Sequence, residues 1–81
     1  MLQDRLVGLV KQILEKNGID RAPAPEARLS EVGLASMDMV NLMFAVEAEF
    51  DIELPPNEIT PENFHSIATI EALLTRIGVT G

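Results

Sequence analysis

The chain has 81 residues, 47% of them hydrophobic and 4% aromatic, which is enough for one small globular domain and leaves no room for a second. It has no cysteine and one histidine, which excludes a disulfide framework and a zinc site of cysteine and histidine ligands. The net charge is −7, and no Lys or Arg lies between Leu29 and Thr75, so nucleic acid phosphates and anionic lipids repel this stretch. Basic protein surfaces are its natural complement, although a small acidic domain also stays soluble in this way.

The first predicted element is an amphipathic helix over residues 2–16, followed by the stop signal Asn17-Gly18. Its apolar residues recur at helical spacing: Leu2, Leu6, Leu9, Val10, Ile13 and Leu14. Acidic and basic residues occur from its first turn, so we expect neither a signal peptide nor a membrane span, and a cytoplasmic protein. Residues 18–35, with two prolines and Gly33 among polar residues, predict a long ordered loop. The loop is expected to be pinned by Ile19, Leu29, Val32 and Leu34.

The second long helix is predicted over residues 36–50, because Pro55 and Pro56 block its continuation. Thr60-Pro61-Glu62 predicts the start of a short third helix, with a capping hydroxyl and an acid near the positive end of the helix dipole. Ser66 is expected to cap a last helix that ends at Gly78, and residues 78–81 are expected to fray. The sequence therefore predicts one all-α domain over residues 1–81, with three longer helices, a short one and no strand.

Both sides of the second long helix are apolar. At about 100° per residue, the expected core side holds Met39, Leu42, Met43, Val46 and Phe50. The opposite side holds Met37, Asn41, Phe44, Ala45 and Ala48. Such a helix either sits in the middle of a bundle or presents one face to a partner, and this chain has too few helices to surround it. We favour a docking face; the alternative is that Met37 and Phe44 fold under the long loop.

Ser36 stands at the start of this helix, where two readings are open. A serine there is most often the N-cap, although the reciprocal capping box is missing because Met39 stands three residues on. A helix amino terminus also favours a phosphate, because free backbone N–H groups and the helix dipole both stabilise negative charge. The residues alone leave the cap ahead of the phosphate.

A family resemblance bears on this choice. Residues 29–37 (LSEVGLASM), followed by Val40, Leu42 and residues 46–55 (VEAEFDIELP), resemble the acyl carrier protein family. Its pattern is an Asp-Leu-Gly-x-Asp-Ser-Leu-like motif, then a helix that ends in Glu-Phe-Asp, then an apolar residue and a proline. The resemblance covers nearly the whole chain and implies a small four-helix bundle, with a long loop between its first two helices.

The resemblance implies that Ser36 receives phosphopantetheine from coenzyme A through a phosphopantetheinyl transferase. The thiol at the end of that arm holds an acyl or aminoacyl group as a thioester, as in fatty acid, polyketide or nonribosomal peptide biosynthesis. Nothing beside Ser36 resembles a general base, so no catalytic residue is expected and the protein is not expected to be an enzyme.

The implied partners are the transferase, an acyl or amino acid ligase, and downstream synthases and transferases with basic docking patches. Acidic side chains would steer these patches, while Met37 and Phe44 supply the apolar contact, and docking would be weak and sensitive to salt. The expected docking residues are Met37, Asp38, Asn41, Phe44, Ala45, Glu47 and Ala48. Glu49 and Glu53 are expected to help steer, and the protein is expected to be a monomer.

The chain departs from the family pattern at Ala35, where an Asp is usual, and at Asn41 and Ala48, where acids are common. Stand-alone carriers that accept amino acids from free-standing ligases look similar, with a non-Asp residue before the serine and a Phe-x-Ser-Ile segment like residues 64–67. Aminoacyl or specialised secondary-metabolite cargo is therefore favoured over housekeeping fatty acid synthesis. The alternative function is an unmodified acidic interaction module in which Ser36 is only the N-cap; Ser36→Ala would then cost about 1 kcal/mol of stability and leave partner binding intact.

Overall fold

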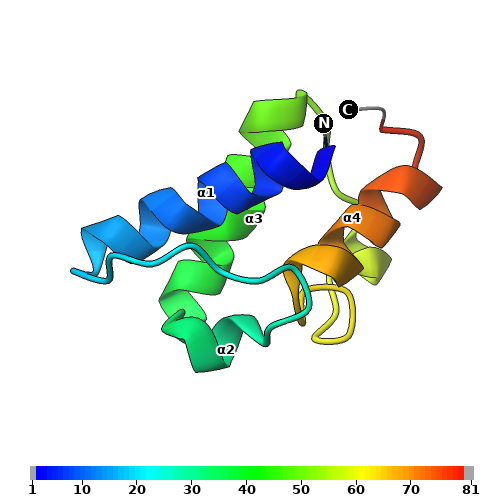
Figure 1. The fold of residues 1–81 in the computed structure, drawn as a ribbon. Helices are drawn as coiled ribbons and strands as arrows, with labels where there is room; N and C mark the ends of the chain where they lie inside the picture. Colours follow the sequence, from blue (N-terminus) through cyan, green and yellow to red (C-terminus); the bar gives the residue numbers. More distant parts are fainter. Residues whose placement is uncertain (1, 80–81) are drawn as a thin grey trace.

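Three long helices form the frame of the molecule in the computed structural model, which describes residues 2–79 (Figure 1). Helix α1 spans Leu2–Lys16, α3 spans Ser36–Phe50 and α4 spans Ile67–Arg76. The first two coincide with the predicted ranges, and α4 begins directly after the predicted cap Ser66. Helix α1 packs against both α3 and α4, and the described residues contain no strand. The predicted all-α class is therefore confirmed.

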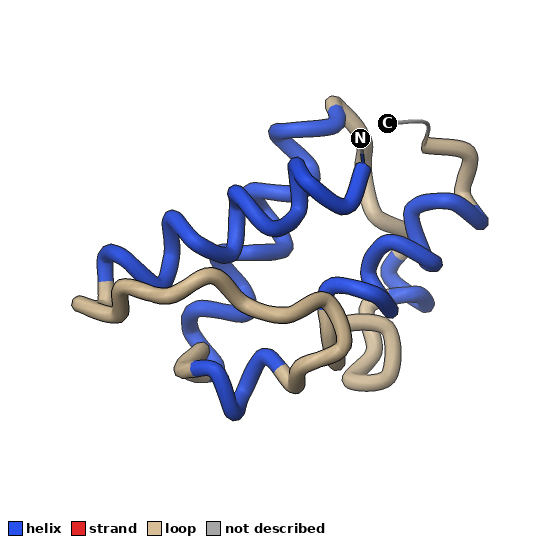
Figure 2. Tube along the Cα trace, viewed as in Figure 1, coloured by secondary structure: helices blue, strands red, loops and turns tan. Residues whose placement is uncertain are grey.

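The short elements differ from the prediction. The loop between α1 and α3 contains a short helix, α2 (Leu29–Val32), where the sequence predicted loop only. Its turn closes because the N–H groups of Glu31 and Val32 both donate to the carbonyl of Arg28, and Gly33 ends it at φ 122°. Figure 2 shows it as a short blue turn between two tan segments.

The short helix predicted to start at Thr60 does not form; a 3-10 turn, η1 (Pro56–Glu58), precedes that position, and residues 61–64 form turns. Thr60 Oγ1 does accept a hydrogen bond from Asn63 N–H at 3.2 Å, as a cap would. The Asn63 amide, however, reaches back to the backbone oxygen of Glu58 at 2.7 Å, and the buried Phe64 anchors the segment in the core. The side chains thus hold a single turn that leads directly into α4.

The loop between α1 and α2 is fastened to the start of α4. Ala68 N–H donates to the carbonyl of Pro25 at 2.9 Å, and Leu29 N–H donates to the carbonyl of His65 at 3.0 Å. In Figure 1 this loop runs back beneath α1 to reach the amino-terminal end of α4. Of the predicted anchors, Leu29 and Leu34 are buried, and Ile19 and Val32 are half-buried against the core.

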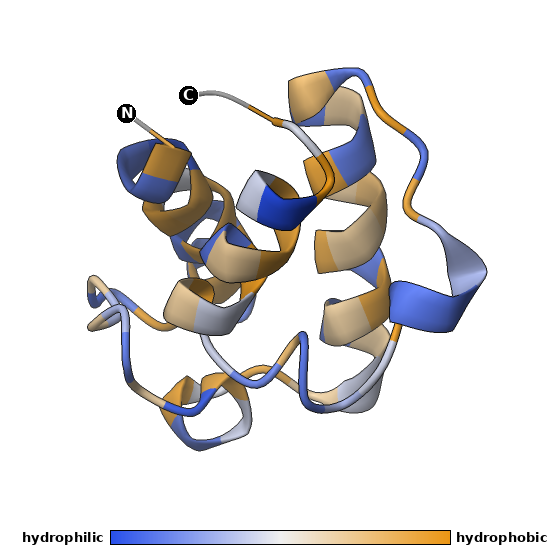
Figure 3. Ribbon diagram, turned by 90° about the vertical axis from the view of Figure 1, so that its right-hand side faces the viewer, coloured by the Kyte–Doolittle hydropathy of each residue, from blue (hydrophilic) through white to orange (hydrophobic). Residues whose placement is uncertain are grey.

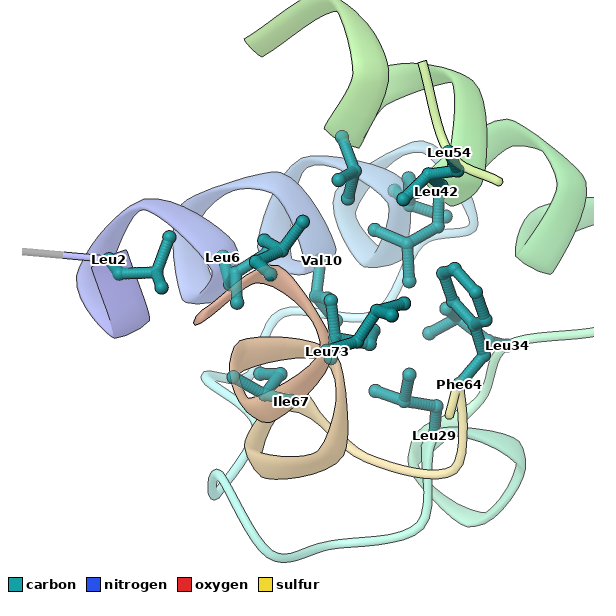
Figure 4. Close-up of a cluster of buried hydrophobic side chains, with 14 of the residues drawn as sticks. Leu2, Leu6, Val10, Leu29, Leu34, Leu42, Leu54, Phe64, Ile67 and Leu73 are labelled. Atoms are coloured by element: carbon teal, nitrogen blue, oxygen red, sulfur yellow. The ribbon is translucent and has the colours of Figure 1, made fainter. Parts of the chain in front are cut away.

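One hydrophobic core joins all of these elements. Leucine, isoleucine and valine side chains of α1 and α4 meet Leu42 and Val46 of α3, and Leu54 and Phe64 close the core from the loops (Figure 4). The expected core side of α3 is confirmed, since Leu42 and Val46 are fully buried while Met39, Met43 and Phe50 pack half-buried against them. With so little aromatic content, aliphatic packing supplies the main stabilisation by burial.

The two ends of α4 are held by hydrogen bonds. Ser66, which is buried, accepts from Thr69 N–H at 3.2 Å, and Thr69 Oγ1 accepts from Ser66 N–H at 3.0 Å, so the predicted cap is confirmed. At the other end Gly78 adopts φ 96°, and Val79 N–H donates to the carbonyl of Leu74 at 2.9 Å. Fraying was expected for residues 78–81; 78 and 79 instead close the helix end, and 80–81 lie outside the described residues.

Arg5 fastens α1 to the carboxyl-terminal end of α3. Its Nε and one terminal nitrogen donate to the carboxylate and the backbone oxygen of Glu49, each at 2.9 Å. Its guanidinium also lies 4.4 Å from the centre of the Phe50 ring, within range of a cation–π interaction. Within residues 2–79, no helix combines the length and apolar character that crossing a bilayer needs.

Candidate functional site

Ser36 is the first residue of α3, and it is exposed. The N-cap is Ala35, which has an extended backbone and no side-chain oxygen, so the alternative in which Ser36 is the N-cap is wrong. The cap was misplaced because the helix begins at Ser36 itself, one residue earlier than a serine cap at this position requires. The Ser36 hydroxyl has no hydrogen-bond partner among residues 2–79, and the fold does not need it as a cap.

Asp38 takes over part of the capping role. Its carboxylate oxygen Oδ2 accepts from Ala35 N–H at 2.9 Å and from the side-chain amide of Asn17 at 2.8 Å. This is the reverse half of a capping box, which the sequence analysis sought at Met39 and therefore missed. The two bonds tie the start of α3, and with it Ser36, to the end of α1.

An open groove of about 560 Å³ begins at Ser36 and is lined mostly by apolar side chains. One wall is the amino-terminal half of α3, and the other comes from α2 and the segment before α4. The lining residues are Ser30, Ser36, Met39, Val40, Met43, Ile59, Thr60, Pro61, Phe64 and His65. His65 is exposed, and no local pattern indicates that it shares a groove with Ser36. No hydrogen bond joins the two side chains within the part of the chain that the structure describes.

The outer side of α3 is an exposed apolar face. Met37 is 77% exposed and Phe44 58%, so the alternative in which they fold under the loop is wrong. Asn41 and Ala48 are also exposed, while Ala45 is half-buried. Val40, 48% exposed, completes an apolar stripe of Met37, Val40 and Phe44; its spacing of three and four residues from the other two was a signal that the sequence analysis did not use. Figure 3 shows orange and pale residues along most of α3.

The acidic side chains of α3 border this stripe and are engaged within the chain. Asp38 is bound to Asn17 and Ala35, as described above. Glu47 accepts from Leu54 N–H at 2.8 Å, and Glu49 pairs with Arg5 at 2.9 Å. Of the predicted steering residues, only Glu53 is exposed and has no hydrogen bond or ion pair within residues 2–79. The same residues hold no group of three or more side chains that could ligate a metal ion.

Comparisons with known proteins agree with this geometry. A family model described as "Phosphopantetheine attachment site" matches residues 4–77. Aminoacyl carrier protein 1 of Bradyrhizobium diazoefficiens is 53% identical over 73 residues, which are 90% of this chain and 81% of that protein. Aminoacyl carrier protein of Agrobacterium fabrum is 41% identical over 66 residues, which are 76% of this chain and 80% of that protein.

Solved structures show the same fold. One is the carrier protein in a crystal structure of Bradyrhizobium japonicum glycine:[carrier protein] ligase complexed with glycylated carrier protein; it is 53% identical, with a TM-score of 0.78 over 90% of this chain and 99% of that chain. MacpD, an acyl carrier protein of Pseudomonas fluorescens, is 22% identical, with a TM-score of 0.79 over 98% of this chain and 72% of that chain, and it supports the fold alone. The chain therefore belongs to the acyl carrier protein family, whose members carry covalent phosphopantetheine, and within that family it groups with the aminoacyl carrier proteins.

Proposed function

We propose that Ser36 is the residue that carries phosphopantetheine and that the cargo is an amino acid. The observation that carries the proposal is the Ser36 hydroxyl itself, which is exposed at the mouth of the groove and free of any structural hydrogen bond among the described residues. A serine that only capped α3 would accept a hydrogen bond from the first turn. The aminoacyl relatives support the choice of cargo.

The residues around Ser36 fit a phosphodiester. The N–H groups of Ser36, Met37 and Asp38 open the helix and have no acceptor within it, and Ala35 offers no side-chain oxygen to occupy them. They are available to the phosphate, and the helix dipole favours its charge. The Asp38 carboxylate, which would repel a phosphate, is engaged by Ala35 and Asn17. The arm supplies the thiol that holds the cargo as a thioester.

The proposed partners follow from this site. A phosphopantetheinyl transferase activates the Ser36 hydroxyl, because the neighbourhood described above contains no hydrogen-bonded base for it. A ligase that activates an amino acid loads the arm, as the glycylated relative in complex with its ligase supports. The chain itself has no catalytic role in this proposal; it acts in the cytoplasm as a monomer and passes the cargo to downstream enzymes. The apolar stripe, with Asn41, Ala45 and Ala48 beside it, is the proposed docking face.

The test is intact mass spectrometry after incubation with coenzyme A, Mg²⁺ and a broad-specificity phosphopantetheinyl transferase. We expect a gain of one phosphopantetheine in the natural protein and none in Ser36→Ala. Ser30→Ala is the matched control, because Ser30 is also exposed and lines the same groove. Ser30→Ala should be modified like the natural protein. An unmodified mass with several transferases, and in protein isolated from its native host, would leave only an interaction module.

The cargo is tested on the modified protein. Incubation with the Bradyrhizobium japonicum glycine:[carrier protein] ligase, ATP and each of several amino acids should add the mass of one amino acid, and hydroxylamine should release it, as it does a thioester. A holo-protein that accepts fatty acyl groups and no amino acid from any ligase would contradict the aminoacyl part of the proposal while leaving Ser36 as the attachment site.

A further inference from the structure

We propose that Arg76 acts as a latch: it holds residues 55–62, which form part of one wall of the groove, against α4, and salt loosens that wall by screening the contact. The latch concerns how the groove opens and goes beyond the proposed function, because it operates whatever Ser36 carries.

Residues 55–62 are anchored at their two ends and not along their length. The flanking Leu54 and Phe64 are buried in the core, whereas none of the eight residues from 55 to 62 is buried. Ile59, the one large aliphatic side chain among them, is 41% exposed. The residues of this segment that line the groove are Ile59, Thr60 and Pro61. Burial therefore fixes this part of the wall weakly.

The backbone hydrogen bonds of the segment are local as well. The N–H groups of residues 58–60 all donate to carbonyls of residues 55–58. Three of the eight residues are proline and have no N–H to donate. Within residues 2–79, no backbone hydrogen bond consequently joins residues 55–62 to α1, α3 or α4.

Arg76, in the last turn of α4, supplies the link that the backbone lacks. One of its terminal nitrogens donates to Glu58 Oε1 at 3.2 Å and to Asn63 Oδ1 at 3.3 Å. The side-chain amide of Asn63 in turn donates to the backbone oxygen of Glu58 at 2.7 Å and to Glu58 Oε1 at 3.0 Å. In the part of the chain that the structure describes, Arg76–Glu58 is the one hydrogen bond or ion pair between residues 55–62 and a long helix.

The Arg76–Glu58 contact is exposed enough to open. The Arg76 side chain is 53% exposed and that of Glu58 33%, and ion pairs at such positions are weak and screened by salt. Arg76 is the only Lys or Arg after Arg28, so no neighbouring cation in the sequence can replace it. Opening the contact exposes no buried side chain of residues 55–62, so the segment can loosen while the core stays packed.

The test is amide hydrogen exchange at Ile59 and Phe64, measured by NMR on protein whose Ser36 is unmodified. Both N–H groups are hydrogen-bonded within this region, to the carbonyls of Pro56 and Thr60, so their exchange rates report its opening. Arg76→Gln and Glu58→Gln each remove one charge of the latch. Arg5→Gln is the matched control, because it removes the same charge as Arg76→Gln and breaks the ion pair with Glu49 instead. Circular dichroism verifies the fold of each variant.

We expect Arg76→Gln to exchange both amides about two- to fivefold faster than the natural protein at low salt, the range that an exposed ion pair supports. Arg5→Gln should leave both rates unchanged. The double variant Glu58→Gln, Arg76→Gln should exchange no faster than Arg76→Gln, since both substitutions remove the same contact. In about 1 M salt, where the screening length is about 3 Å, the natural protein should exchange as fast as Arg76→Gln.

Three results would each overturn the latch. The first is that Arg76→Gln exchanges at the natural rate in low salt, or no faster than Arg5→Gln. The second is that the accelerations of the two single variants multiply in the double variant. The third is that the difference between Arg76→Gln and the natural protein persists in about 1 M salt, which would assign the effect to packing of the arginine stem. Intact mass after transferase treatment reports the proposed function separately, because the exchange experiment uses arm-free protein.

Discussion

Gly33→Ala tests how tightly the junction between α2 and α3 is packed. Gly33 ends α2 at φ 122° and ψ 8°, a backbone conformation that L-residues with a side chain rarely adopt. A Cβ added there would overlap Ile19 Cδ1 and lie 3.5 Å from Leu14 Cδ2. Gly18, at φ 78°, is the matched control, because nothing lies within 4 Å of the Cβ that alanine would add.

Both substitutions place a side chain at a positive φ, but only Gly33→Ala also brings a Cβ into a neighbouring side chain. Positive φ costs alanine about 1–2 kcal/mol, partly offset by about 0.4–1 kcal/mol from the stiffer unfolded chain, so Gly18→Ala should lose about 1 kcal/mol. Gly33→Ala adds overpacking against Ile19, worth about 1–3 kcal/mol, for a total of about 2–4 kcal/mol. A domain of this size has about 4–12 kcal/mol of stability, so a variant of average stability should fold but melt about 10–30 °C lower.

Urea denaturation followed by far-ultraviolet circular dichroism is the assay, because the chain has neither Trp nor Tyr to report by fluorescence. Ile19→Val removes the overlapping methyl group and should recover about 1 kcal/mol in the Gly33→Ala background, although it costs stability on its own. The reasoning is refuted if Gly33→Ala is no more destabilising than Gly18→Ala, or if the Ile19 and Gly33 substitutions add independently.

Two further predictions concern the helix ends and the α1–α3 contact. Ser66→Ala should lower the free energy of unfolding by about 1–2 kcal/mol, because it removes the acceptor of Thr69 N–H, whereas Ser36→Ala should change it by less than about 0.5 kcal/mol. Equal losses in urea melts would mean that Ser36 does cap α3. Arg5→Met keeps the apolar stem but removes the ion pair with Glu49 and the cation–π contact with Phe50, for a loss of about 1–2 kcal/mol in low salt. A melt like that of the natural protein would show that this surface contact is weak.

The long helices could be predicted because their signals are local. Apolar periodicity and the stops at Asn17-Gly18 and before Pro55 are read within a few residues, and they gave both bounds of α1 and α3. The short elements could not be predicted in this way. Helix α2 exists because Leu29 is buried and its N–H finds the carbonyl of His65, a contact across the fold that no local pattern records.

The candidate site likewise has features that local sequence predicts and features that depend on tertiary packing. The exposed face with Met37 and Phe44 was predicted from the helical periodicity of α3 alone. The position of Ser36 one residue inside the helix, and the bond between Asp38 and Asn17, depend on how α1 and α3 pack. Asp38 and Glu49 likewise meet partners far away in the sequence, Asn17 and Arg5, whereas Glu47 accepts from Leu54, only seven residues on.

The groove at Ser36 lies between two parts of the molecule, each of which is held together by its own hydrogen bonds. On one side, α3 is tied to α1 through Asp38 and Asn17; on the other, α2 and its loop are tied to the start of α4 through Leu29–His65 and Ala68–Pro25. Within residues 2–79, no hydrogen bond spans the groove between these parts. Separating its walls therefore breaks only apolar contacts, whereas changing the shape of either wall breaks hydrogen bonds. We therefore expect the width of the groove to change more readily than the shape of either wall.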